Sequence, residues 1–288
     1  MTTPVVALLG TGTMGSAMAR AMRRADLPVR AWNRSRTKAE PLREHGVVVA
    51  DSPAEAAQGA EIVVTMLFDI AAVVDVVRRA APAPGTLWLQ TSTVGVQDVR
   101  TAAEVAEELG LVLVDCPVSG TRQPAEKGEL LVLAAGPDDA RDKAAPVLDA
   151  IGSRTLWVGA VGQGTRLKLV VNAWLLSLTA ATAQSVAMAE GLGLDPQLFL
   201  DAIAGGPTDT PYARLKGQAM IKHEYPVAFA LAAALKDAGL VLEALRDAGV
   251  PEVLGAAVQQ ILSAAAERVD PAAVDLGAAV EALRPQHG

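Results

Sequence analysis

A glycine-rich turn near the N-terminus constrains the fold of this 288-residue chain more than any other feature. The apolar run Val5–Leu9 is typical of a strand buried on both faces of a parallel sheet, and it leads directly into a G-x-G-x-x-G sequence and a helical segment from Ser16. In this setting the first glycine permits a tight turn, the second lets the backbone approach a pyrophosphate, and the third lets the helix pack on the strand. The pattern predicts a dinucleotide site, with a plain structural turn as the alternative. The residues that would form this site are Gly10, Gly12, Thr13, Met14 and Gly15.

Strand and helix patterns alternate from this turn to about residue 159. Apolar runs predict further strands at 29–33, 47–50, 61–67, 86–92, 111–115, 130–136 and 154–159. Because helical segments separate most of these runs, we predict an α/β fold with a Rossmann-type doubly wound parallel sheet. Ligands of such sheets lie beyond the carboxyl ends of the strands, so Met66, Leu67 and Thr93 are expected to line the cofactor pocket. A helix-capping role is the alternative for Thr93.

The remainder of the chain has helical patterns only, at about 165–190, 212–220, 229–248, 253–269 and 274–283. We therefore predict two domains. Residues 1–162 would bind the cofactor, and residues 163–288 would form an all-helical C-terminal domain for substrate binding and oligomerisation, joined by the long interdomain helix. The alanine-rich segment Leu231–Leu245 is apolar around much of its circumference, which favours burial against another subunit in a homodimer or homotetramer.

The strand at 29–33 ends where an NAD-selective site usually carries an acidic residue for the ribose 2′-hydroxyl. The sequence there is Asn33-Arg34-Ser35, followed by Arg36, Thr37 and Lys38, without a carboxylate. Arg34 is able to pair with a 2′-phosphate and Ser35 to donate a hydrogen bond to it. The segment predicts NADP(H) over NAD(H), with a solvated basic loop as the alternative.

Composition argues against several other classes of protein. The formal net charge of -7 without a long basic run disfavours a nucleic-acid partner. A single cysteine, Cys116, and three scattered histidines disfavour a metal centre, so none is predicted. The N-terminus lacks an export signal, and the longest apolar stretch, Leu167–Leu178, is interrupted by polar residues and falls short of a membrane span. We expect a cytoplasmic protein.

Two further stretches carry polar groups in apolar surroundings. Lys168 and Asn172 lie four residues apart in the helix expected from residue 165, which places both on one face. A lysine that extends to solvent is the alternative for Lys168. The strand at 111–115 runs into a turn around Ser119-Gly120 and then a loop closed by Gly128. Such a turn offers several donors to a carboxylate, although Ser-Gly also marks many ordinary turns.

Four stretches together resemble the β-hydroxyacid dehydrogenase family, which includes 3-hydroxyisobutyrate dehydrogenases and glyoxylate/succinic semialdehyde reductases. They are Leu9–Gly15, Asp115–Gly120, Gly162–Asn172, and Phe229 with Lys236-Asp237, and in order and spacing they cover nearly the whole chain. The string from Pro117 to Gly128 most resembles the semialdehyde reductases.

The resemblance implies a role for each matching residue. Lys168 would be the essential catalytic residue and Asn172 would assist in binding the substrate. Ser119 and Gly120 would hold the substrate carboxylate, and Thr93 and Lys236 would contact the nicotinamide end of the cofactor. Thr121, Phe229 and Asp237 would belong to the substrate pocket, with ordinary core as the alternative for Phe229.

The sequence departs from the family pattern beside the expected carboxylate site. Cys116 stands where alanine is common, and Thr121 where a second glycine is frequent. These departures put the identity of the substrate in doubt but not the chemistry. Without a nearby histidine, Cys116 is expected to be a small buried side chain and not a nucleophile.

The function predicted from the sequence is hydride transfer between NADP(H) and a small carbonyl or hydroxy acid, by semialdehyde or glyoxylate reduction or 3-hydroxyacid oxidation. Lys168 would be its general acid/base. Imine reduction is a second hypothesis, although imine reductases of similar fold typically lack this lysine and the Pro-Val-Ser-Gly string. A non-catalytic nucleotide-sensing module is a third, but such a module has no reason to keep Ser119, Lys168 and Asn172 together.

Overall fold

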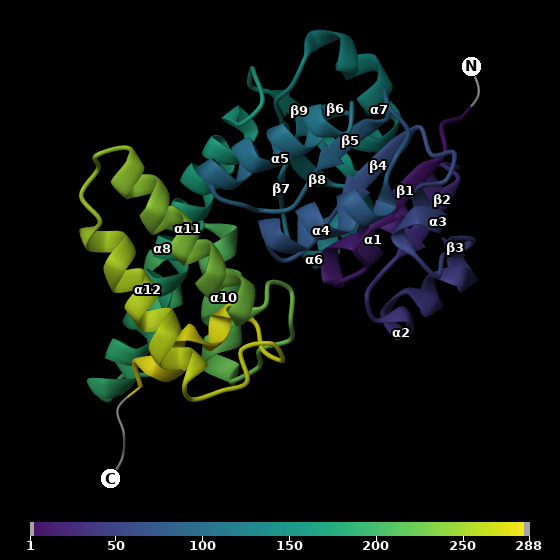
Figure 1. The fold of residues 1–288 in the computed structure, drawn as a ribbon. Helices are drawn as coiled ribbons and strands as arrows, with labels where there is room; N and C mark the ends of the chain where they lie inside the picture. Colours follow the sequence, from purple (N-terminus) through teal and green to yellow (C-terminus); the bar gives the residue numbers. More distant parts are fainter. Residues whose placement is uncertain (1–2, 285–288) are drawn as a thin grey trace. The chain divides into compact units, whose positions relative to one another are not determined.

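The computed structural model describes residues 3–284, and the chain divides into two compact units, Met1–Lys168 and Leu169–Gly288. Figure 1 shows the course of the chain. The first unit contains the β-strands, and the second consists of helices.

The first unit is built on a six-stranded parallel sheet in the order β3-β2-β1-β4-β5-β6. This order is that of dinucleotide-binding sheets, and it confirms the predicted fold class. The strands are short and begin and end together, as in the register of Val6 with Val29 and with Ile62. Their bounds are β1 Val6–Leu9, β2 Val29–Trp32, β3 Val48–Val49, β4 Ile62–Thr65, β5 Leu87–Gln90 and β6 Val112–Asp115.

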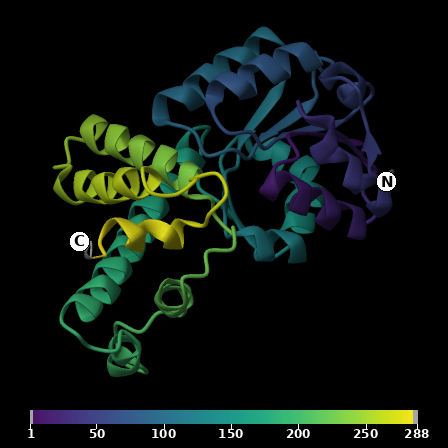
Figure 2. The ribbon, with the colours of Figure 1, turned by 90° about the horizontal axis from the view of Figure 1, so that it is seen from below.

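Helices cover both faces of this sheet, because alternate strand residues point to opposite sides. Val6 and Leu8 of β1 belong to one buried cluster, whereas Ala7 and Leu9 belong to another. The first cluster includes residues of α1 and α7, and the second those of α3, α4 and α5 (Figures 1 and 2). The helices of this unit are α1 Thr13–Arg24, α2 Arg36–Ala39, η1 Glu40–His45, α3 Pro53–Ala57, α4 Ile70–Ala80, α5 Val96–Glu108, α6 Arg122–Lys127, η2 Asp138–Ala140 and α7 Arg141–Ile151.

The strands after β6 differ from the sequence prediction, because they form a second, three-stranded sheet in the order β7-β8-β9. The chain reverses after Asp115, so β7 (Val118–Ser119) pairs antiparallel with β8 (Leu130–Ala134) instead of extending the parallel sheet. β9 (Gly152–Trp157) then adds to β8 in parallel. The loop expected between Ser119 and Gly128 was also wrong, because the short helix α6 occupies most of it.

The second unit consists of α9 Gln197–Ile203, α10 Pro211–Lys222, α11 Leu231–Asp247, α12 Val253–Ala266, the 3-10 helix η3 Leu276–Ala282, and most of α8 Gln163–Gly191. One buried cluster joins α8, α10, α11, α12 and η3. The α-helix expected at 274–283 is a 3-10 helix whose first turn is capped by Asp275. The segment Leu231–Leu245 lies in α11, which packs against α12 and η3 of its own chain (Figure 2), and its burial against another subunit stays a prediction.

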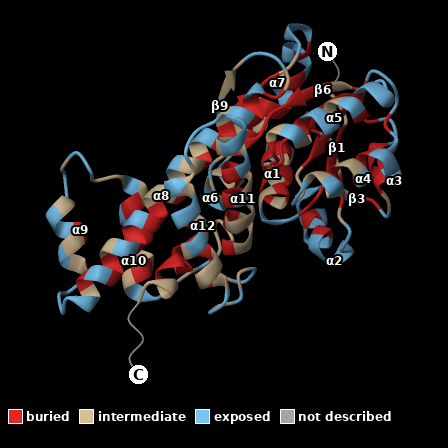
Figure 3. Cartoon of the chain, turned by 60° about the vertical axis from the view of Figure 1, so that its left-hand side comes forward, coloured by how far each residue is buried: buried red, intermediate tan, exposed pale blue. Residues whose placement is uncertain are grey.

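Helix α8 is the longest element and supplies residues to both units. By length and composition alone it is sufficient to cross a membrane, contrary to the sequence-based expectation, and 44% of its most apolar window is buried in the protein. A core helix passes the same test, so this is weak evidence for a membrane span. Red and pale blue segments alternate along it in Figure 3. Val170, Trp174 and Met188 are its exposed large apolar side chains.

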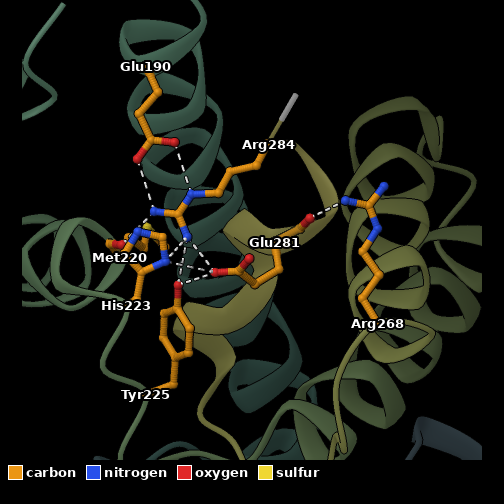
Figure 4. A network of polar contacts seen from close by, with 7 residues as sticks. All are labelled: Glu190, Met220, His223, Tyr225, Arg268, Glu281 and Arg284. Atoms are coloured by element: carbon orange, nitrogen blue, oxygen red, sulfur yellow. Dashed lines mark hydrogen bonds and ion pairs between the residues drawn. The ribbon is translucent and has the colours of Figure 1, made fainter. Parts of the chain in front are cut away.

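A polar network ties the last described residues to the C-terminal half of α8 (Figure 4). The Arg284 guanidinium donates to both carboxylate oxygens of Glu190, at 2.9 and 3.0 Å, and to the carbonyl oxygen of Met220 at 2.8 Å. It also pairs with Glu281 and donates to the Tyr225 hydroxyl at 3.0 Å. One side chain thus joins α8, α10 and η3 within the second unit.

Candidate active site

Each of the three motif glycines is favoured at its position for a different structural reason. Gly10 has a left-handed φ of +109°, and a Cβ there would lie 2.2 Å from the carbonyl oxygen of Met66. A Cβ on Gly15 would lie 2.0 Å from the carbonyl oxygen of Gly10. Nothing lies within 4 Å of a Cβ built on Gly12. Turn geometry and close packing therefore demand the first and third glycines, whereas the second keeps an open surface that a phosphate can approach.

The start of α1 fits an anionic ligand. Thr13, Met14 and Gly15 are its first helical residues, and its N-cap Gly12 provides no side-chain hydrogen bond to their N–H groups. The first turn contains no acidic residue. The buried Thr11 hydroxyl in the same turn has no hydrogen-bond partner among residues 3–284. Uncapped N–H groups and an unused hydroxyl are the donors that a dinucleotide pyrophosphate requires.

Asn33 holds the glycine turn and the loop after β2 together. Its Oδ1 accepts a hydrogen bond from the backbone N–H of Thr11 at 3.0 Å, and its Nδ2 donates to the carbonyl oxygen of Ser35 at 3.0 Å. Arg34 and Ser35 are exposed beside it. The next arginine, Arg36, forms ion pairs with Asp51 and Glu40, so its guanidinium is already engaged. Asn33 thus shapes the expected cofactor segment, a role that the sequence pattern did not reveal.

The carboxyl ends of β4 and β5 carry Met66, Leu67 and Thr93, as predicted. A buried polar network fixes these ends. The Ser92 hydroxyl accepts from the N–H of Leu67 at 2.9 Å, and the Thr91 hydroxyl donates to the carbonyl oxygen of Thr65 at 2.7 Å. This network was not predicted from the sequence, although threonine and glutamine inside otherwise apolar strands are a visible signal.

The expected carboxylate-binding turn lies at the end of β7. Ser119 is half-buried in the strand, and Gly120 is exposed with a φ of +135°. A Cβ on Gly120 would lie 2.7 Å from Cδ2 of Leu130. Thr121 is the N-cap of α6 and makes no side-chain capping bond. A half-buried hydroxyl, an exposed backbone and an uncapped helix start lie in three consecutive residues, which together can supply several donors to one carboxylate.

A buried aspartate anchors the beginning of α8. Asp115, the last residue of β6, accepts hydrogen bonds from the N–H groups of Gly162 and Thr165 at 3.1 and 2.8 Å, and from the Thr165 hydroxyl at 2.7 Å. Burial raises the pKa of this carboxyl above its ordinary value, although these hydrogen bonds act in the opposite direction. Asp115 lies in one of the family motifs, but its role as an anchor was not predicted from the sequence.

The neighbouring Cys116 is fully buried. Burial, and then the charge of Asp115, raise the pKa of its thiol well above the ordinary value. This supports the expectation of a small buried side chain, because a reactive cysteine needs a lowered pKa.

Lys168 lies one helical turn beyond the anchored start of α8. Only 8% of its surface is exposed, so the alternative of a lysine extending to solvent was wrong. Asn172 follows one turn later and is also buried. One helix therefore carries an ammonium and an amide on one face, as the spacing predicted.

In the second unit, Asn172 meets the polar pair at the start of α11. Its Nδ2 donates to Oδ2 of Asp237 at 2.8 Å, and Nζ of Lys236 lies 2.8 Å from Oδ1 of Asp237. Phe229 lies just before α11 and packs partly against the core of this unit. Its backbone N–H donates to Asp275 at 2.9 Å. The structure thus brings Asn172, Lys236 and Asp237 together, and it gives the Phe229 side chain core contacts.

The sheet order, the phosphate-binding turn and the buried lysine on the long helix define a dinucleotide-binding protein with a second, helical unit. Comparison with known families identifies both parts. Residues 5–159 match the NAD binding domain of 6-phosphogluconate dehydrogenase, and residues 162–283 match the NAD-binding domain of NADP-dependent 3-hydroxyisobutyrate dehydrogenase. The chain belongs to the β-hydroxyacid dehydrogenase family of nicotinamide-dependent oxidoreductases.

Whole-length relatives agree with this assignment. Glyoxylate/succinic semialdehyde reductase 1 of Arabidopsis thaliana is 33% identical over 97% of this chain and 98% of its own. The chloroplastic reductase 2 of the same plant is 32% identical over 97% of this chain and 79% of its own. The solved structure of Mycobacterium tuberculosis 3-hydroxyisobutyrate dehydrogenase with L-serine has a TM-score of 0.87 and 28% identity, and the match covers 99% and 100% of the two chains.

Proposed function

We propose that this protein is an NADPH-dependent reductase of small carbonyl acids, such as semialdehydes or glyoxylate, and that it oxidises the corresponding hydroxy acids in reverse. The observation that carries the proposal is the burial of Lys168 on a helix anchored to the strand that precedes Ser119-Gly120. The names of the two Arabidopsis relatives support the same class of substrate.

The proposed chemistry needs a proton donor at the carbonyl oxygen. When bound, the nicotinamide supplies the hydride that adds to the carbonyl carbon. Negative charge then develops on the oxygen, and the Lys168 ammonium stabilises that charge and donates a proton to it. In the oxidative direction the neutral amine accepts the proton. Ser119 and the backbone of Gly120 bind the substrate carboxylate through hydrogen bonds.

Asn172 has its amide orientation fixed by the carboxylate of Asp237, which accepts from Nδ2. An amide held in this way presents its carbonyl oxygen in one direction only. We assign Asn172 to substrate binding on this basis and on its resemblance to the family motif. Lys236, held by Asp237, is proposed to contact the cofactor.

The preference for NADPH rests on the loop after β2. Arg36 is engaged by two carboxylates, whereas the exposed Arg34 guanidinium has no ion-pair partner among residues 3–284. Arg34 therefore remains available for a 2′-phosphate. We expect Arg34→Ala to weaken NADPH binding by roughly tenfold or more and to leave NADH binding nearly unchanged. Fluorescence titration of both cofactors measures this, and an unaltered preference would remove the assignment.

The central test replaces Lys168. We expect Lys168→Ala to lower kcat by about 10²-fold or more while NADPH still binds. Lys168→Arg should recover little activity, because a guanidinium keeps the charge but does not release a proton near neutral pH. Lys143→Ala, an exposed lysine on α7, is the matched control and should be as active as the unmodified protein. Retained turnover in Lys168→Ala would exclude the lysine from the mechanism.

The substrate is decided by the same assay. NADPH oxidation is followed with glyoxylate, succinic semialdehyde, methylmalonate semialdehyde and a cyclic imine. Turnover of the carbonyl acids supports the proposal, turnover of the imine alone supports imine reduction, and NADPH binding without turnover of any compound supports a nucleotide-sensing module.

Assembly into a homodimer or homotetramer is also proposed, and exposed apolar side chains of α8 support it in addition to the α11 segment. Trp174 is 67% exposed, and Val170 and Met188 extend the same apolar side of the helix. Sedimentation at monomer mass would exclude the oligomer, and Trp174→Glu should dissociate it.

A further inference from the structure

Asp115 acts on the beginning of α8 as a helix cap supplied from another part of the chain. An N-cap residue normally accepts a hydrogen bond from the third helical N–H with its own side chain. Here the residue before the helix is Gly162, which has no side chain, and the third helical residue is Thr165. The carboxylate of Asp115 accepts that N–H from 50 residues earlier, together with the Gly162 N–H and the Thr165 hydroxyl.

Close backbone packing makes this anchor stiff. A Cβ on Gly164 would lie 2.4 Å from the carbonyl oxygen of Leu133 and 2.6 Å from that of Asp115. The first turn of α8 therefore rests directly on the backbone of β6 and β8. β8 also pairs with β7, which carries Ser119.

Asp115 is itself held on both sides. Its backbone N–H and carbonyl oxygen exchange hydrogen bonds with Ala135 at 2.9 and 2.8 Å, and β6 pairs with β5 at this position. Four residues later the chain reaches Ser119. One short segment thus holds the first turn of α8 with a side chain and continues into the turn proposed to bind the substrate carboxylate.

Lys168 follows Thr165 by three residues, so the two side chains lie on one face of α8. Helical side chains also lean toward the N-terminus, which directs the lysine stem back over the anchored turn. We propose that Asp115 is a positioning residue, which sets the location of the Lys168 ammonium relative to Ser119 by fixing the first turn of the helix. This inference rests on the proposed function, because it assigns Lys168 and Ser119 to one reaction.

The hydrogen bonds, and not the charge, perform this task. An asparagine at position 115 keeps an oxygen acceptor for the two N–H groups, and its amide N–H can donate to the Thr165 hydroxyl, which reverses its role. An alanine removes all three bonds. The raised pKa of the carboxyl agrees with a site that gains little from ionisation.

The test compares kcat, KM and cofactor affinity in variants of Asp115. We expect Asp115→Ala to lower kcat by about 10- to 100-fold, because a displacement of roughly 1 Å in a reacting group has effects of this size. NADPH affinity should change by less than about threefold, because the phosphate-binding turn lies elsewhere in the unit. Asp115→Asn should restore kcat to within about threefold of the unmodified protein.

Three further variants separate a positioning role from a general loss of stability. Val147→Ala, in the buried core of the same unit on α7, lowers stability without touching the anchor, so its kcat should stay near the unmodified value. Thr165→Val removes one of the three bonds and Thr165→Ser keeps it, so only the valine variant should lose kcat. This pair decides the question if Asp115→Ala does not fold.

Amide hydrogen exchange gives a readout that does not depend on activity. Exchange across residues 162–166 should rise in Asp115→Ala and Thr165→Val and should stay low in Asp115→Asn and Thr165→Ser. Should the unmodified protein reduce none of the carbonyl acids, the proposed function fails while this exchange pattern still tests the anchor. Unchanged exchange, unchanged kcat in folded Asp115→Ala, or an equal loss of kcat in Val147→Ala would each overturn the positioning role.

Discussion

Asp115 in the first unit and Asp275 in the second are both buried carboxylates that accept backbone N–H groups from a segment distant in sequence. Asp115 holds Gly162 and Thr165 at the start of α8. Asp275 accepts from Ala228 and Phe229 at 3.1 and 2.9 Å, and so holds the segment that leads into α11. Each aspartate thereby fixes the entry to a helix that carries residues of the proposed site.

These two carboxylates, here called the Asp115 and Asp275 clamps, differ in how their negative charge is balanced. Asp275 forms a buried ion pair with Lys216, whose side chain is 4% exposed. Asp115 has no ion-pair partner among residues 3–284, and its pKa is raised by burial. Three or four hydrogen bonds therefore suffice to hold a helix entry, whereas a buried charge requires either a counter-ion or a shift toward the neutral acid.

The largest effect is expected from removing the counter-ion of Asp275. Lys216→Met leaves a buried carboxylate without its cation, which should lower the free energy of unfolding by about 3–5 kcal/mol. Lys222→Met, at the exposed end of the same helix, is the control and should change stability by less than about 0.5 kcal/mol. Urea unfolding followed by circular dichroism measures both. A loss below 1 kcal/mol in Lys216→Met would show that the hydrogen bonds alone support Asp275.

Gly164, beside the Asp115 clamp, has rigid surroundings, whereas Gly217, beside the Asp275 clamp, has surroundings that can adjust. A Cβ on Gly164 meets backbone oxygens of Leu133 and Asp115, which cannot move without shifting β8 or β6. A Cβ on Gly217, next to Lys216, meets only the Leu200 side chain at 2.8 Å. We expect Gly164→Ala to destabilise the protein by about 3 kcal/mol. Gly217→Ala should change stability by less than about 1 kcal/mol, since the leucine can adjust and alanine favours the helix. Equal melting temperatures for the two variants would contradict this difference.

The sequence predicted the parts of the site that follow a local rule. The glycine turn, the residues that follow β4 and β5, and the spacing of Lys168 and Asn172 depend on residues close together in the chain, and the structure places them as expected. Burial of Lys168 was not predictable from α8 alone, because an apolar helix with one lysine is equally typical of a solvent-facing side chain.

Long-range contacts were not predictable from the sequence, for a physical reason. The bonds of Asp115 to Thr165 and of Asn172 to Asp237 join residues 50 and 65 positions apart. The second sheet escaped for the same reason, because an apolar run such as β8 does not reveal which strand it will pair with. Asp115 stood at the end of an apolar strand, and a charged residue at such a position was the one available signal.

An intermediate effect is expected at Arg284, where the ion pair is only partly buried. Arg284→Met removes the pairs with Glu190 and Glu281 and should lower the free energy of unfolding by about 2 kcal/mol at neutral pH. The hydrogen bond from Arg284 lowers the pKa of Glu190, so this stabilisation is present above about 4.5 and is lost as the pH falls. Thermal melts at pH 7 and pH 3.5 should therefore show a smaller difference between variant and unmodified protein at the lower pH. A difference that grows on acidification would contradict the role given to Glu190.

The smallest effect, on the pH dependence of stability, distinguishes the two clamps most directly. Burial raises the folded-state pKa of Asp115 above its ordinary 3.8, so its contribution to stability is full below that pH and is lost as the pH rises through the folded value. The Asp115→Asn variant cannot ionise at this position, so it does not lose stability in this way as the pH rises. We expect the variant to gain stability relative to the unmodified protein between pH 4 and pH 7, as measured by urea unfolding at several pH values.

Lys216→Met extends the same experiment to the second unit. Once its cation is removed, Asp275 is a buried carboxylate without a counter-ion, as Asp115 is, so this variant should lose stability relative to the unmodified protein as the pH rises. Adding Asp275→Asn to Lys216→Met should abolish that loss while keeping an oxygen acceptor for the N–H groups of Ala228 and Phe229. If the stability of the double variant still falls as the pH rises, the loss does not come from Asp275, and the counter-ion does not explain the difference between the two clamps.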